Sequence, residues 1–157
     1  MTTECYIKGR FDYGVGKCAV VITEDAKTAE EKKVLHQVAW KVPDEWKYKG
    51  ETIKADQFNC EILAATYALD WCMKNGKELV NIYANTTTCQ KWYMRGEFPE
   101  SRSAAGKMYL DMMDALQHKV DEEQGQQVRE VVYAEYKPKN DKSEWNWLVN
   151  DLALGVK

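Results

Sequence analysis

The segment from residue 56 to residue 74 places the strongest constraint on how this chain can fold. Apolar residues recur on nearly every side of the helix that it would form, so other elements must cover most of its surface. One face carries a stripe made largely of small side chains at helical spacing: Glu61, Ala65, Ala68 and Cys72. We therefore predict a central helix that begins at Asp56 or Asn59, ends at Lys74, and lies close against a sheet with Glu61 directed at it.

Segments with the alternation of β-strands lie on both sides of this helix. Three precede it, and the first two are joined by a tight turn at residues 12–14: strands 5–9, 17–23 and 34–42. Two strands and three helices follow it: strands 79–83 and 128–136, and helices 86–94, 103–120 and 143–154. The connections 43–54 and 121–127 are predicted as a loop and a solvated turn.

The order β-β-β-α-β-α-α-β-α predicts an α/β domain in which helices flank a five-stranded mixed sheet. Three antiparallel strands come first, and two parallel strands follow. The chain has 157 residues, and 45% of them are hydrophobic. This length and composition suit a single domain, residues 1–157, with a substantial core.

Composition excludes several classes of protein. No apolar run approaches the roughly 20 residues that span a bilayer, and the first residues lack a secretory signal, so we expect a cytoplasmic protein with no membrane partner. The five cysteines are odd in number and widely spaced, which indicates neither a disulfide framework nor a zinc site. The net charge of −3 means that nucleic acid could be bound only by a local basic surface.

Four segments, taken in order, resemble the type 1 ribonuclease H family, especially its bacterial forms with a shortened middle region. They are CYIKGRFDYGVGKCAVVI, NCEILAATYALDWCMKNG, NIYANTTTCQKW and NWLVNDLA, and they begin at residues 5, 59, 81 and 146. The resemblance covers nearly the whole chain. It implies the ribonuclease H-like fold, which agrees with the element order predicted above.

The resemblance also implies a catalytic site that this chain has altered. The family cleaves the RNA strand of an RNA–DNA hybrid with two Mg²⁺ ions held by four carboxylates. Of the four corresponding positions only Glu61 is acidic, because the others are Lys8, Asn85 and Asn150. The family's mobile histidine corresponds to Asn140.

One cation, one anion and two neutral amides leave these four positions without net charge, whereas Mg²⁺ requires several anionic oxygen ligands. We therefore predict no metal and no other cofactor, with Mg²⁺ bound only if the family activity survives. We also predict that Lys8 forms a partly buried ion pair with Glu61. Two alternatives stay open: a shift of one residue would bring Asp151 into the site, and Asp12 could reach it from the hairpin turn.

Two basic groups of residues are candidates for nucleic-acid binding. The first gathers beside the altered site: Lys8, Arg10, Lys137, Lys139 and Lys142. The second corresponds to the part of the family fold that handles the DNA strand: Lys91, Trp92, Tyr93, Arg95, Arg102 and Lys107, of which Lys91, Trp92 and Arg95 are the binding candidates. For this second group we favour a solvated helical face whose tryptophan packs in the core.

Three functions remain open from the sequence. The first is a ribonuclease H-like protein that has lost hydrolysis but binds RNA–DNA hybrid or other nucleic acid. The second is a protein-interaction module built on the same scaffold. The third is an active hybrid ribonuclease whose metal ligands are displaced.

Overall fold

The computed structural model describes residues 3–24, 33–77, 80–84, 92–93, 95–124, 131–134 and 143–156. A five-stranded sheet with the order β3-β2-β1-β6-β7 forms its centre. Its strands are β1 (Thr3–Asp12), β2 (Val15–Glu24), β3 (Lys33–Val42), β6 (Val80–Tyr83) and β7 (Val131–Ala134).

The pairing confirms the predicted mixed sheet. Strand β2 runs antiparallel to both β1 and β3, whereas β1, β6 and β7 are parallel to one another. The pairing of β1 with β6 ends at Tyr6 and Tyr83. Among the described strands, none pairs with that edge of β1 beyond Tyr6, and we call this side of residues 7–12 the open edge of β1.

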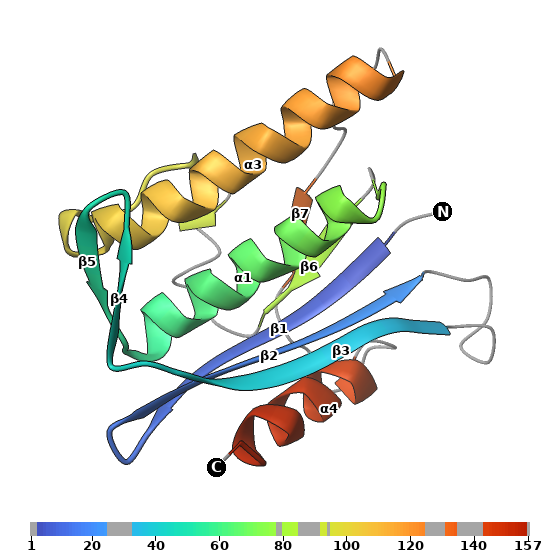
Figure 1. The fold of residues 1–157 in the computed structure, drawn as a ribbon. Helices are drawn as coiled ribbons and strands as arrows, with labels where there is room; N and C mark the ends of the chain where they lie inside the picture. Colours follow the sequence, from blue (N-terminus) through green and yellow to red (C-terminus); the bar gives the residue numbers. More distant parts are fainter. Residues whose placement is uncertain are drawn as a thin grey trace.

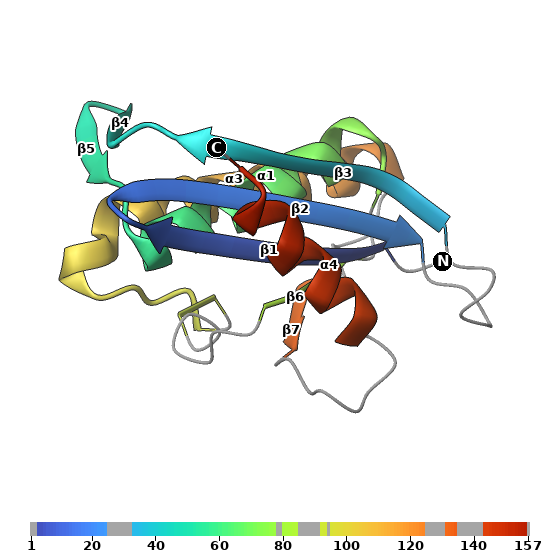
Figure 2. The ribbon, with the colours of Figure 1, turned by 90° about the horizontal axis from the view of Figure 1, so that it is seen from below.

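Helices cover both faces of this sheet. Helices α1 (Gln57–Lys74) and α3 (Ser103–Gln124) lie on one face, with the short 3₁₀ helix η2 (Glu100–Arg102) before α3, and α4 (Ser143–Leu154) lies on the other face (Figures 1 and 2). The predicted central helix is confirmed as α1: the Asp56 carboxylate caps it by accepting a hydrogen bond from Asn59 N at 2.8 Å. None of the helices in the described part of the chain is both long and apolar enough to cross a membrane.

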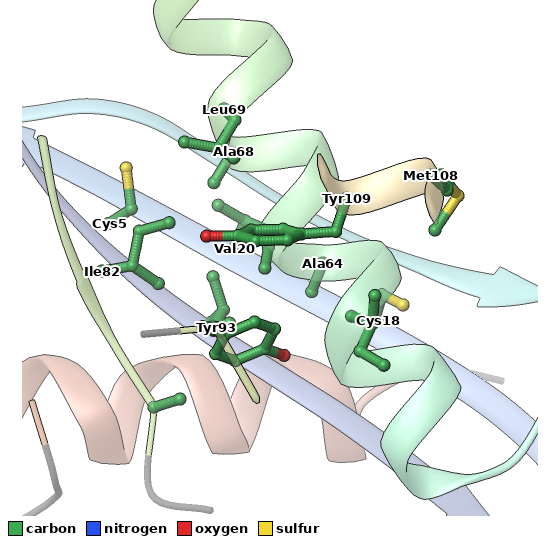
Figure 3. Packing of buried hydrophobic residues seen from close by; sticks show 14 of the residues in the cluster. Cys5, Cys18, Val20, Ala64, Ala68, Leu69, Ile82, Tyr93, Met108 and Tyr109 are labelled. Atoms are coloured by element: carbon green, nitrogen blue, oxygen red, sulfur yellow. The ribbon is translucent and has the colours of Figure 1, made fainter. Parts of the chain in front are cut away.

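The small side chains of α1 allow it to lie close to the sheet, as predicted. Ala64, Ala65 and Ala68 are fully buried, and Glu61 is only 2% exposed. Figure 3 shows this core between α1, the strands and α3, with the labelled residues Cys5, Cys18, Val20, Ala64, Ala68, Leu69, Ile82, Tyr93, Met108 and Tyr109. A second buried cluster fills the α4 face: Tyr6, Ala19, Val21, Tyr83, Val149 and Ala153.

The prediction of a loop over residues 43–54 is wrong. This segment forms a second, two-stranded sheet from β4 (Glu45–Tyr48) and β5 (Glu51–Lys54). Lys49 and Gly50, at the turn between them, have φ angles of 47° and 82°. The alternation that suggested an amphipathic loop is that of a strand, because Trp46 and Tyr48 pack against the core while Lys47 is exposed.

The predicted turn at residues 121–127 is wrong in its first part, because α3 continues to Gln124. Glu and Gln are good helix formers, so a polar stretch after an amphipathic helix is as compatible with another solvated turn of helix as with a loop. Most of the predicted helix at residues 86–94 lies outside the described residues. Cys5, Cys18, Cys60 and Cys72 are buried free thiols, and Cys89 also lies outside the described part.

Candidate functional site

Helix α1 reaches the open edge of β1 at Gly9. A Cβ atom added at Gly9 would lie 2.1 Å from the backbone nitrogen of Glu61, so only glycine permits this close approach. The contact places Glu61 beside Lys8. From the opposite face of the sheet, α4 brings Asn150 to the same edge, where it contacts Arg10.

The carboxylate of Glu61 is buried between the sheet and the helical layer. The hydroxyl of Tyr93 donates a hydrogen bond to Glu61 Oε1 at 3.4 Å. Burial lowers the pKa of Lys8, and the negative charge of Glu61 opposes this shift. Lys8 is therefore close enough to Glu61 for the two charges to interact.

A second cation, Arg10, lies two residues further along the same face of β1. Its Nη1 donates to Asn150 Oδ1 at 2.9 Å, and its Nε and Nη2 donate to the two carboxylate oxygens of Asp12 at 2.8 and 3.1 Å. Lys17 Nζ lies 3.8 Å from Asp12 Oδ2. The hydrogen bond from Arg10 is the main reason that the pKa of Asp12 is lowered. The guanidinium thus ties the hairpin to α4.

The structure also places the two aspartates that were alternatives for the site. Asn150 makes the contact with Arg10, whereas Asp151 is exposed on the next position of the helix. Asp12 lies near the end of β1, and its two oxygens accept hydrogen bonds from Arg10.

The described residues of this region do not fit a site for two divalent ions. No three side chains of His, Cys, Asp and Glu come together within the described part of the chain in a way that could hold a metal. Lys8 and Arg10 instead bring two cations to the edge where the resemblance would place metal ions. Lys8 lies near Glu61, and Arg10 and Lys17 on the neighbouring strands share Asp12, so these three cations outnumber the two carboxylates by one.

Members of the second predicted basic group differ in burial and in their contacts. Trp92 is half-buried, with its ring centre 5.8 Å from that of Phe58 and 6.1 Å from that of Phe98, which is the packing expected of a core residue. Arg95 is exposed. Nearby Arg102 is paired with Asp56 and lies over the ring of Phe58, so the charge of this arginine is already compensated.

Six of the predicted site residues lie outside the described residues: Asn85, Lys91, Lys137, Lys139, Asn140 and Lys142. Ala84, the residue before Asn85, is described and is buried directly after β6. The roles of the six residues remain predictions from the sequence.

Two features of the site were missed by sequence reasoning. The contact of Arg10 with Asp12 could have been predicted, because residues two apart on a strand share a face. The hydrogen bond from Tyr93 to Glu61 could not be predicted from a local sequence pattern, because 32 residues separate the two partners. Tyr93 is 5% exposed and reaches Glu61 only through the packing of the segment before α3.

No protein-family model matches the sequence, and no curated protein matches it either. Solved structures do match. The N-terminal RNase H domain of Rv2228c from Mycobacterium tuberculosis has a TM-score of 0.66 and 16% identity, over 99% of this chain and 98% of that one. RNase H1 from Halobacterium salinarum has a TM-score of 0.65 and 10% identity, over 98% and 96%.

A third similar structure is LC11-RNase H1, isolated from compost by a metagenomic approach, in complex with an RNA/DNA hybrid. Its TM-score is 0.61 at 16% identity, over 99% of this chain and 96% of that one. The protein is therefore an α/β domain with a mixed sheet between two helical layers. More particularly, it has the ribonuclease H fold, as the four sequence segments predicted.

Proposed function

We propose that this protein binds nucleic acid along the open edge of β1 and does not perform metal-dependent hydrolysis. The observation that carries the proposal is the presence of Lys8 and Arg10 at an edge where hydrolysis would require carboxylates. A phosphate group is an anion, and lysine and arginine can bind it without a metal ion. The complex of LC11-RNase H1 with a hybrid supports RNA–DNA hybrid as the first nucleic acid to test.

The charges favour this edge over the start of α1. At that helix, Asp56 already occupies the N-terminus and pairs with Arg102, so the local positive charge is compensated. On the β1–β2 hairpin, which includes this edge, Arg10 and Lys17 share the single carboxylate of Asp12. The proposed phosphate contacts therefore belong to the β1–β2 hairpin.

Hybrid binding should depend steeply on salt. If about three phosphates are neutralised, the affinity should fall roughly 40-fold between 50 and 200 mM salt, because binding releases condensed counterions. Fluorescence anisotropy of a labelled hybrid measures this slope. Lys17→Gln should reduce the slope by about one unit, whereas the control Lys47→Gln, at an exposed position of β4 in the second sheet, should leave it unchanged.

Two results would contradict the proposal. If the protein does not bind the hybrid even at low salt, the proposed nucleic-acid function is wrong. Cleavage of the hybrid in the presence of Mg²⁺ or Mn²⁺, abolished by Glu61→Gln, would instead support the active ribonuclease with displaced ligands.

A second candidate function rests on a different surface. A largely apolar groove of about 560 Å³ lies between β3, α1 and α3, where Trp40, Tyr67 and Met112 line it. Such a groove suits an interaction module on the same scaffold. It becomes the leading candidate if the protein binds no nucleic acid at low salt.

A further inference from the structure

The end of the β1–β2 hairpin carries two exposed aromatic side chains. Phe11 is 43% exposed and Tyr13 is fully exposed. In the strand register Phe11 lies opposite Gly16, which has no side chain to cover the ring. The hairpin thus presents two rings to solvent in a protein that buries Tyr6, Tyr83, Tyr93 and Tyr109.

The backbone at the tip is an unusual place for a tyrosine. Asp12 pairs with Val15, and the two residues between them, Tyr13 and Gly14, have φ angles of 52° and 77°. A two-residue hairpin turn with positive φ at both positions favours asparagine before glycine. Tyrosine is disfavoured at such an angle, so local folding does not explain this ring.

A pair of cations precedes the turn, on the other face of the hairpin from Phe11. Arg10 and Lys17 are opposite one another in the register of β1 and β2, and the carboxylate of Asp12 lies between them. Phe11 and Gly16, the next pair, lie on the opposite face because successive side chains of a strand alternate. Like charges that face one another across a pair of strands are unfavourable. An exposed ring at a turn beyond such a pair has the composition of surfaces that bind single-stranded nucleic acid, where bases stack on aromatic rings and cations hold the backbone.

We propose that the hairpin binds single-stranded nucleic acid, with an unpaired base stacked on Tyr13 at the turn and Arg10 and Lys17 near the phosphates. This inference rests on the proposed nucleic-acid function and refines it. The ring of Tyr13 selects unpaired bases, because a base inside a duplex has both faces covered by its neighbours. Contact with the outside of a duplex and contact with a protein are the competing outcomes of the test.

The test compares a labelled DNA oligonucleotide of mixed sequence with the same strand annealed to its RNA complement. Tyr13→Asn removes the ring but keeps a residue that tolerates positive φ, so thermal unfolding should show no loss of stability. Binding of the single strand should weaken about tenfold, with an unchanged salt slope, and binding of the hybrid should change little. Tyr13→Trp should retain single-strand binding, and Phe11→Ala should weaken it less than Tyr13→Asn does.

Three other outcomes would overturn the inference, and they can be told apart. If the wild-type protein binds neither probe, the proposed function fails and the inference fails with it. If the wild type binds the single strand and Tyr13→Asn binds it equally well, the inference alone fails. If Tyr13→Asn weakens binding of both probes to the same degree, the hairpin contacts the nucleic-acid backbone rather than unpaired bases, and the proposed stacking is refuted.

Discussion

Lys8→Met is expected to lower the free energy of unfolding by about 3 kcal/mol at neutral pH, because it leaves a buried carboxylate without its neighbouring cation. Glu61 is 2% exposed, and its charge acts on Lys8 against the effect of burial on the lysine pKa. The hydrogen bond from Tyr93 remains, but one neutral donor does not replace a cation. Chemical denaturation of wild type and variant measures the difference.

The matched control is Lys47→Met, at an exposed position of β4, which should change stability by no more than about 0.5 kcal/mol. The double variant Lys8→Met/Glu61→Gln should recover most of the loss, since a glutamine can still accept from Tyr93 without a buried charge. If Glu61→Gln recovers nothing, the loss does not arise from an interaction between the two residues.

Gly9→Ala is expected to destabilise the protein by about 3 kcal/mol, because the added methyl group meets backbone rather than a movable side chain. The nearest atoms are Glu61 N at 2.1 Å, Cys60 C at 2.5 Å and Glu61 Cα at 2.6 Å. Helix α1 must shift away from β1, which also separates Glu61 from Lys8.

The control for this change is Gly155→Ala at the end of α4, where an added Cβ would make ordinary contacts of 3.5 Å and more. Thermal or chemical unfolding of both variants gives the comparison. Native-like stability of Gly9→Ala would show that α1 does not approach β1 as closely as described, and the arrangement of the site would then need revision.

The fold was predictable where packing demands show in local sequence patterns. The small residues Ala65, Ala68 and Cys72 predicted a helix pressed against a sheet, and all three are fully buried there. Strand alternation predicted the mixed sheet. Prediction failed at residues 43–54, because a short exposed hairpin and an amphipathic loop show the same alternation, and only the packing of Trp46 and Tyr48 on the core distinguishes them.

The sequence predicted several residues of the candidate site, but not the contacts between them. The resemblance placed Lys8, Glu61 and Asn150 in one region, and strand periodicity puts Lys8 and Arg10 on one face. The bond from Arg10 to Asn150 spans 140 residues, so it follows from how α4 crosses the sheet and not from any local pattern. The exposure of Tyr13 likewise depends on a turn geometry that its residue type does not favour.

The most direct test of the account is a calorimetric titration of the wild-type protein with Mn²⁺, which substitutes for Mg²⁺ at oxygen-ligand sites. With Lys8 and Arg10 at the edge of β1, we expect no saturable binding of the metal. The triple variant Lys8→Asp/Asn85→Asp/Asn150→Asp, if it folds, provides a comparison in which binding should appear. Saturable uptake of Mn²⁺ by the wild type that is lost in Glu61→Gln would contradict the account.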